Sequence, residues 1–214
     1  MLLHCLGGVG YAANSYLVTD SRTGHALLFD GSAEPEEVRR VLQEESCTLS
    51  AVLLTHGHFD HMLNLPELKA GFQCPVYVGA ADLPLLSPES RANVAELMFG
   101  RKFAGCEAQA LPDGSFAPGG IPVKVFPAPG HTAGGVFYEL PGFFITGDTL
   151  MAGSCGRSDL PTGSRKDLRA SLTFLAGRLR RLPGSTLICP GHGPQTTAEE
   201  ELLHNTFLNN PALI

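Results

Sequence analysis

The chain has 214 residues, of which 43% are hydrophobic and 17% charged, and its formal net charge is −6. This length and composition predict one globular domain, residues 1–214, with a proper hydrophobic core, and they exclude a disordered chain. The acidic balance gives no electrostatic reason to bind nucleic acid, whose phosphates require clustered Lys and Arg. A small-molecule partner is therefore expected.

The sequence lacks the patterns expected of a membrane span or a signal peptide. No run approaches the ~18 apolar residues that a membrane span needs, and the N-terminal stretch lacks the positive region and apolar core of a signal peptide. The six cysteines lie far apart without a C-x-x-C pair, which is typical of free thiols. We expect a cytoplasmic protein that does not bind membranes, and no pattern indicates an oligomeric state.

The first half of the chain alternates predicted strands and helices. Three short β-type runs with intervening turn residues predict an antiparallel meander. A proline suited to the first turn and apolar residues at helical spacing then predict an amphipathic helix. In chain order, the predicted elements are strands 2–6, 15–18 and 26–29, helix 34–45, strand 51–54, helix 60–70, strand 75–78 and helix 89–99.

The second half begins with the longest predicted loop, Gly100 to Gly120, which is rich in glycine and could cover a site. A leucine stripe from Leu168 to Leu182 predicts a helix over 165–182 that packs on a sheet. The other predicted elements are strands 123–126, 136–140, 143–146 and 186–189 and a terminal helix from about Ala198. Strands and helices alternate in both halves, which indicates an α/β fold.

The segment Thr55 to His61, "THGHFDH", follows the apolar run 51–54 and holds four metal-ligand side chains in six positions. His56 and His58 can point to the same side of the strand end, while Asp60 and His61 can reach over from the next turn. A polar loop with satisfied histidines is the plain alternative, but the density of ligands makes a metal site the better interpretation.

Three more ligand-type residues occupy similar places, each beyond an apolar strand and beside glycine. They are His131 in "PGHTAGG", Asp148 in "TGDTL" and His192 in "PGHGP". Each alone could be an ordinary loop residue, whereas the joint pattern predicts a site built at strand ends. The remaining histidines are not accompanied by other ligand-type residues and are interpreted as structural or surface residues. They are His4, His25 and His204.

These motifs, in this order, resemble those of the metallo-β-lactamase fold superfamily. The resemblance covers most of the chain and implies a four-layer αβ/βα sandwich, in which two mixed β-sheets are flanked by helices and a dinuclear site lies at one edge. It implies that the first metal is bound by His56, His58 and His131, the second by Asp60, His61 and His192, and that Asp148 bridges both. Asp60 and His61 are also expected to be catalytic.

The ligand set contains imidazoles and carboxylates without a thiolate, and so suits two divalent ions, Zn²⁺ most of all, with Fe or Mn as alternatives. Two such ions with two carboxylates and one hydroxide leave roughly one positive charge, which favours an anionic substrate. Because His58 stands where flavin-linked di-iron members have Glu, redox di-iron chemistry is disfavoured. Asp148 disfavours antibiotic hydrolysis, since true β-lactamases generally lack this bridging residue.

Within the superfamily, "SCGRSDLPTGS" and "CPGHGPQTTAEEELLHNTFL" look most like the short, single-domain glyoxalase II-like thioesterases. The resemblance implies hydrolysis of an S-acylated glutathione such as S-lactoylglutathione through a metal-bridging hydroxide. Arg157 could bind a substrate carboxylate, or could instead form a salt bridge with Asp159. Cys155 could touch substrate or simply fill a tight turn.

A second interpretation is a mononuclear iron persulfide dioxygenase on the same fold. Its facial triad would be His56, His131 and Asp148, and "SCGRSD" resembles a stretch of those enzymes. The chain has Gly-His-Gly-Pro around its last motif histidine, where those enzymes typically have Ala-His-Asp-Tyr. The hydrolase interpretation is therefore preferred, and one bound iron against two bound ions would separate the two.

Overall fold

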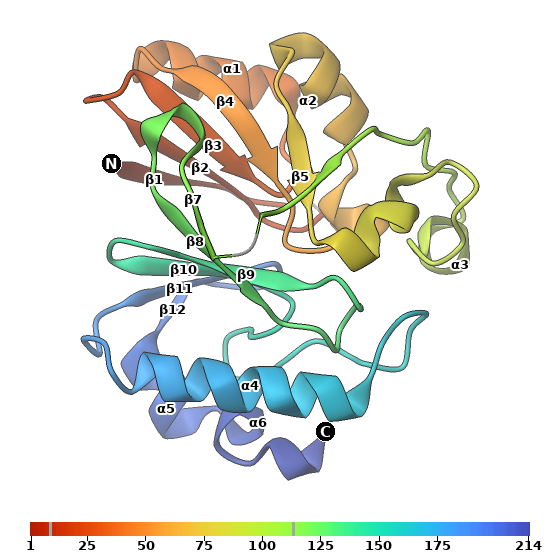
Figure 1. Ribbon diagram of the computed structural model, residues 1–214, viewed down its shortest axis with the longest axis vertical. Helices are drawn as coiled ribbons and strands as arrows, with labels where there is room; N and C mark the ends of the chain where they lie inside the picture. The colour runs from red at the N-terminus through yellow and green to blue at the C-terminus, as the bar shows by residue number, and fades with distance from the viewer. Residues whose placement is uncertain (9, 113) are drawn as a thin grey trace.

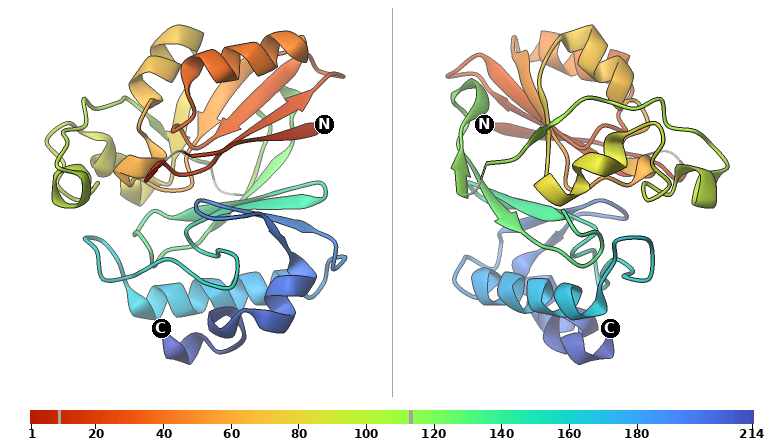
Figure 2. Two further views of the ribbon diagram at one scale, coloured as in Figure 1. Left: turned by 180° about the vertical axis from the view of Figure 1, so that it is seen from behind. Right: turned by 45° about the vertical axis from the view of Figure 1, so that its right-hand side comes forward.

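The computed structural model describes residues 1–8, 10–112 and 114–214 (Figure 1). In this part of the chain, two six-stranded sheets lie face to face, and helices cover the outer face of each. The layers run from helices α1 and α2, through the first sheet and the second sheet, to helices α4, α5 and α6 (Figures 1 and 2). The predicted αβ/βα sandwich with two mixed sheets is confirmed.

The first sheet takes all of its strands from the first half of the chain, in the order β1-β2-β3-β4-β5-β6. Strands β1 to β3 pair antiparallel, with Tyr16 opposite Phe29, and this confirms the predicted meander. From β3 to β6 the pairing is parallel. The strands are β1 Leu2–Leu6, β2 Ser15–Asp20, β3 His25–Phe29, β4 Thr48–Leu53, β5 Val76–Val78 and β6 Gln109–Ala110.

Two helices cover this sheet. Helix α1, Pro35–Glu44, starts at a proline and buries Val38, Val41 and Leu42, as its helical spacing predicted. Helix α2, Leu65–Phe72, follows the short 3-10 helix η1, Phe59–His61, which carries the end of the "THGHFDH" segment. The single helix predicted over 60–70 is therefore two, with a break at residues 62–64.

The second sheet has the order β12-β11-β10-β9-β8-β7 and uses only the second half of the chain. Its pairing is antiparallel except for the parallel neighbours β10 and β11. The strands are β7 Gly114–Phe116, β8 Val123–Pro127, β9 Val136–Leu140, β10 Phe143–Gly147, β11 Leu187–Pro190 and β12 Thr196–Thr197.

Helix α4, Arg165–Leu179, packs its leucine stripe on this sheet, as predicted. The Ser164 side chain accepts a hydrogen bond from the backbone of Asp167 and caps the helix. Two short helices, α5 Ala198–His204 and α6 Thr206–Asn209, complete the layer before the 3-10 helix η4, Pro211–Leu213.

Three buried apolar layers hold the sandwich together. One lies between α1, α2 and the first sheet, one between the two sheets, and one between the second sheet and α4 to α6. The central layer includes Tyr16, Phe29, Tyr138 and Ile145, all at most 1% exposed. Because both sheets are packed on both faces, their strand ends form a fixed rim on which loops can be positioned.

The helix predicted over 89–99 is wrong over most of its length. Only α3, Ala95–Phe99, is α-helical, and it follows the 3-10 helix η2, Ala80–Leu86, and an irregular segment. Val94 interrupts any longer helix because its φ of 60° lies in the left-handed region. Figures 1 and 2 show that η2 and α3 project beyond the sheets on one side.

The predicted loop from 100 to 120 is also more structured than expected. It contains the edge strands β6 and β7 and the 3-10 helix η3, Pro118–Gly120, while residue 113 lies outside the described residues. These strands are only two and three residues long, which is too short for a period-2 pattern to be recognised. None of the described helices has the length and apolar character needed to cross a bilayer.

Candidate metal centre

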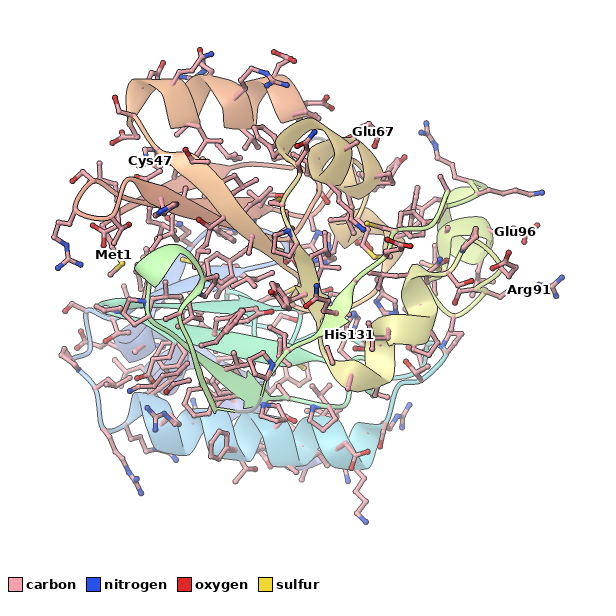
Figure 3. All side chains as sticks on the ribbon, turned by 45° about the horizontal axis from the view of Figure 1, so that its top comes forward. Met1, Cys47, Glu67, Arg91, Glu96 and His131 are labelled. Atoms are coloured by element: carbon pink, nitrogen blue, oxygen red, sulfur yellow. The ribbon has the colours of Figure 1, made fainter. Side chains whose placement is uncertain are left out.

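The seven predicted ligand residues lie at strand ends along one edge of the sandwich. His56 and His58 follow β4, and Asp60 and His61 belong to η1. In the second sheet, three ligand residues follow β8, β10 and β11, and they are His131, Asp148 and His192. Figure 3 labels His131 where the two halves of the molecule meet.

Their side chains form three overlapping groups in which the ligand atoms lie within 4.8 Å of one another. The groups are His56, His58 and His131; His56, His61 and Asp148; and Asp60, His61 and His192. All seven sequence-predicted ligand residues are therefore brought together. The first two groups are fully buried, whereas His192 is 35% exposed at its side chain, so the third group is the more open one.

Asp148 lies between the two halves of this cluster. Its Oδ1 is 3.3 Å from His61 Nε2, and its Oδ2 is 3.4 Å from His131 Nε2 and 3.7 Å from His192 Nε2. The carboxylate thus lies beside histidines of both predicted metal sites. Oδ1 is near His61 of the second site, and Oδ2 is near His131 of the first and His192 of the second. This is the position that the sequence resemblance gave to a bridging ligand.

Several buried polar atoms of the cluster have no hydrogen-bond partner among the described residues. They are the Nε2 atoms of His56, His58 and His61 and Oδ1 of Asp148. Buried polar atoms are almost always paired, because an unpaired one costs about 1–3 kcal/mol. Imidazole nitrogen and carboxylate oxygen are also the donors that Zn²⁺, Fe and Mn accept. The residues therefore fit a divalent metal ion.

Two fixed acceptors orient the histidine rings. His61 donates through Nδ1 to Asp30, at 2.9 Å, and His131 donates through Nδ1 to the Arg157 carbonyl, at 2.6 Å. Each bond turns Nε2 of that ring towards the cluster, where His131 Nε2 lies 2.9 Å from His58 Nδ1, and outer partners of metal-binding histidines act in this way. Asp30 is 1% exposed and also accepts from the backbone and hydroxyl of Thr55.

Asp82 joins the two ligand loops. Its Oδ2 accepts from the backbone of Gly57, at 2.9 Å, and from the Thr132 hydroxyl, at 2.7 Å, and its Oδ1 accepts from the backbone of Gly134, at 2.7 Å. Gly57 separates His56 from His58, and Thr132 follows His131. The fully buried carboxylate thereby fixes both loops relative to each other.

Sequence reasoning missed both of these carboxylates. Asp30 follows β3 directly, as His56, His131 and Asp148 follow their own strands closely, so the strand-end rule could have found it. Asp82 lies inside η2, away from any motif, and only its three contacts reveal it.

The cluster combines neutral histidines with ionised carboxylates. Burial and the neighbouring His131 lower the pKa of His58 to about 3, so this ring is a neutral ligand near pH 7. Burial raises the pKa of Asp148, but the charges of His61, His131 and His192 outweigh this effect and hold the pKa well below its usual range. The site therefore offers ionised oxygen ligands to a cation.

In the more open group, the pKa values of His61 and His192 are raised instead of lowered. Burial lowers the pKa of His61, but the carboxylates of Asp30 and Asp148 raise it well above its ordinary value. The pKa of His192 is raised by its hydrogen bond to Asp60, with 3.0 Å between Nε2 and Oδ2. A cation binding here has to displace protons from these two rings.

Glycine is required where the last ligand loop crosses the site. A Cβ on Gly191 would lie 2.3 Å from Asp148 Oδ1 and 2.5 Å from His61 Cε1. Any side chain would thus collide with two ligand residues, whereas glycine lets the backbone pass directly beneath them.

Above the ligands lies a cleft of about 320 Å³. Arg157 lines it, but its guanidinium donates two hydrogen bonds to Asp159, at 2.6 and 2.8 Å. Of the two predictions for Arg157, the salt bridge is thus observed, and carboxylate binding stays a prediction. The cleft is lined by His58, Asp60, Val94, Met98, Phe99, His131, Asp148, Met151, Gly156, Arg157, Leu160 and His192.

The residues predicted to lie outside the site do so. His4 lies near Thr19 and Glu45, His25 bonds Ser50, and His204 lies beside Glu200 on α5. Cys155 packs against the third apolar layer, and burial raises the pKa of its thiol to about 11. The thiol is therefore protonated at neutral pH, and contact of Cys155 with a substrate stays a prediction.

Fold and site together define an αβ/βα-sandwich protein with a His/Asp centre for divalent metal. The family model of the metallo-beta-lactamase superfamily matches residues 8–192, and the chain belongs to this superfamily. It is 34% identical over 206 residues to the probable metallo-hydrolase YqgX of Bacillus subtilis, covering 94% of each chain. These findings support a metal-dependent hydrolase.

Two solved structures resemble the whole molecule. The B3 metallo-beta-lactamase BLEG-1 has 30% identity and a TM-score of 0.86, covering 98% of this chain and all of that one. TTHA1623, solved in a di-iron-bound form, has 34% identity and a TM-score of 0.79, covering 97% of this chain and all of that one.

Proposed function

We propose that the protein is a glyoxalase II-like thioesterase that uses two divalent metal ions to hydrolyse S-acylated thiols of the glutathione type. The observation that carries this proposal is the position of Asp148 between two ligand groups. Its two carboxylate oxygens lie within 3.7 Å of His61, His131 and His192. From this position Asp148 would be a ligand shared by two adjoining metal ions. A single mononuclear triad would leave Asp60, His61 and His192 without a role.

His56, His58 and His131 would hold the first ion, and Asp60, His61 and His192 the second. When bound, such ions supply Lewis acidity and lower the pKa of a coordinated water towards neutrality. Zinc suits this ligand set, and the di-iron form of the similar protein TTHA1623 keeps iron as an alternative.

The chain's own residues provide the geometry for the reaction. In thioester hydrolysis a water oxygen bonds to the acyl carbon, the C–S bond breaks, and the thiolate leaves with the electron pair. Asp30 orients the ring of His61, and the Arg157 carbonyl orients the ring of His131. The ionised carboxylates of Asp60 and Asp148 would offset the charge of the metal ions. Arg157, at the edge of the cleft, is the proposed contact for a substrate carboxylate, which would compete with Asp159.

β-Lactam hydrolysis is the second candidate function. It is favoured by the likeness to BLEG-1, which extends over the whole of that B3 metallo-beta-lactamase. The bridging position of Asp148 favours the thioesterase over it.

The test combines metal analysis with three substrates. Purified protein loaded with zinc should contain two ions per chain and should hydrolyse S-lactoylglutathione faster than a cephalosporin. Oxygen uptake with a glutathione persulfide should stay at background. One iron per chain with persulfide-dependent oxygen uptake would replace the thioesterase by the dioxygenase, and faster cephalosporin cleavage would replace it by the β-lactamase.

A further inference from the structure

The walls of the cleft differ sharply from its floor. The floor consists of metal-ligand residues, including His58, His131 and Asp148. One wall is built by Val94, Met98 and Phe99 around α3, and the other by Met151 and Leu160 in the segment after β10. A polar floor between two apolar walls suits a ligand with one reactive polar group and an apolar remainder.

The walls offer no free charge to a polar ligand. Among the described residues that line the cleft outside the ligand cluster, Arg157 is the cation, and Asp159 engages it through two hydrogen bonds. The same ion pair lowers the pKa of Asp159 to about 2, so both side chains are charged and the pair is neutral overall at pH 7. A hydroxylated or charged acyl group would find a partner in these walls only by displacing Asp159 from Arg157.

Apolar side chains continue from the cleft onto the surface. Met98, on α3, is 48% exposed. Tyr11 is 41% exposed and stacks on Phe99, with ring centroids 4.7 Å apart. Figure 3 shows Arg91 and Glu96 on the same projecting segment, directed outward. Contiguous exposed apolar side chains beside a site usually mark a binding surface.

Val94, in the cleft wall, has a strained backbone conformation that its surroundings hold in place. A β-branched residue at φ 60° is disfavoured, and such conformations persist only where their surroundings enforce them. The neighbouring Asn93 supplies this restraint. Its carbonyl accepts from the backbone of Phe59, its side chain donates to the Leu85 carbonyl, and it accepts from the backbone of Ala95. The wall is therefore tied to η1, which carries Asp60 and His61.

We propose that the cleft walls form an acyl-binding subsite, and that the preferred substrates are thioesters of medium-length, apolar acyl chains. The cleft volume of about 320 Å³ corresponds to about ten water volumes of ~30 Å³ each, enough for a chain of several methylenes. This inference rests on the proposed thioesterase function for the nature of the reacting group. It differs from that function in predicting poor use of the short, hydroxylated lactoyl group.

The experiment is a chain-length series on one carrier. Zinc-loaded protein is assayed with S-acetyl-, S-lactoyl-, S-butyryl-, S-hexanoyl- and S-octanoylglutathione. Burial of one methylene corresponds to roughly fourfold in binding, so kcat/KM should rise by up to about this factor per added methylene until the cleft is filled. A maximum at lactoyl or acetyl would overturn the subsite and leave the thioesterase in place.

Two neighbouring variants on α3 give a matched comparison. Met98→Gln replaces a cleft-lining side chain, whereas Leu97→Gln replaces one that is more exposed and does not line the cleft. Met98→Gln should flatten the dependence of kcat/KM on acyl chain length, and Leu97→Gln should keep the wild-type profile. Equal profiles in both variants would contradict the proposed wall.

A binding measurement separates the subsite from the chemistry. Acetate and octanoate are titrated into the zinc-loaded protein by calorimetry. Octanoate should bind at least tenfold more tightly than acetate, and Met98→Gln should remove this preference. If no thioester is hydrolysed but the preference is found, the thioesterase fails and the apolar subsite stands. If acetate and octanoate bind equally, the subsite is wrong whatever the hydrolysis assays give.

Discussion

At the scale of single residues, the histidine cluster depends on two buried carboxylates that do not line the cleft. Asp30 orients His61, and Asp82 fastens the loops that carry His56, His58 and His131. Both aspartates are at most 1% exposed, so they act by fixing positions rather than by touching a substrate. Removing a metal-ligand residue should therefore change the number of bound ions, whereas removing one of these supporting aspartates should change the affinity for the ions.

Removing the ligand His58 should cost one ion. In His58→Ala, the first ligand group is reduced to His56 and His131, while the group of Asp60, His61 and His192 stays complete. Elemental analysis should give one metal ion per chain in place of two, and thioester hydrolysis should fall at least a hundredfold. Full activity with a single iron would refute the dinuclear hydrolase without touching the fold.

Asp82→Asn should weaken metal binding without removing a ligand. Asp82 accepts from three donors, the backbone N–H groups of Gly57 and Gly134 and the hydroxyl of Thr132. In the Asn variant the side-chain NH2 group is itself a donor, so at least one of these hydrogen bonds is lost. Zinc affinity, measured by competition with a chromophoric chelator, should drop roughly tenfold or more, as for other outer-shell changes. The control is Asp159→Asn, which breaks only the surface pair with Arg157. Equal affinities in both variants would show that Asp82 does not support the site.

At the scale of elements, the C-terminal helices hold a segment of the site. Asn205 is fully buried at the N-cap of α6 and donates to the carbonyls of Met151 and Ser154. Glu201 on α5 accepts from the backbone of Gly153. The restrained segment leads to Arg157, whose carbonyl orients His131. The last helices therefore contribute to the active centre without lining it.

Asn205→Ala should destabilise the fold by about 2–3 kcal/mol, because it removes the cap that accepts from the backbone of Phe207 and Leu208 and the bonds to the carbonyls of Met151 and Ser154. Urea unfolding measures this loss. Asn209→Ala is the matched control, since Asn209 is exposed on the same helix, and it should change stability by less than about 0.5 kcal/mol. If both variants unfold at the same urea concentration, the anchoring role of Asn205 is wrong.

Elements with strong periodicity were predictable, and those with competing local contacts were not. The helices α1 and α4 were predicted with ends within a few residues of the observed ones, because the spacing of their apolar residues alone determines which face packs on the sheet. Residues 89–94 had helical composition, yet the conformation of Val94 and the bonds of Asn93 exclude a helix there. Such tertiary contacts have no local signature.

At the scale of the whole molecule, the site connects the two halves of the sandwich. His56, His58, Asp60 and His61 belong to the half that contains the first sheet, and the other ligand residues follow strands of the second sheet. The order of the motifs and their positions after apolar strands were enough to predict this convergence. Asp82, the Arg157–Asp159 pair and the apolar cleft walls required the folded chain, because each joins residues without a shared motif.

Metal removal should therefore destabilise the entire fold. A ligand present at about a thousand times its Kd adds ~4 kcal/mol to the free energy of unfolding, which for a chain of this size raises Tm by roughly 10 °C. Calorimetric scans with zinc and with a chelator should show this difference, and His58→Ala should show a smaller one. Identical Tm values would mean that no ion is bound across the halves.

The division of strands between the sheets has one more consequence. Strands β1 to β6 come from residues 2–110 and β7 to β12 from residues 114–197, so neither sheet borrows a strand from the other. Two co-expressed fragments divided between β6 and β7 would each keep every inter-strand bond of their own sheet. Their reassociation would depend on the central apolar layer and on the ligand residues contributed by both fragments, so we expect a divalent metal ion to promote complementation of the two fragments.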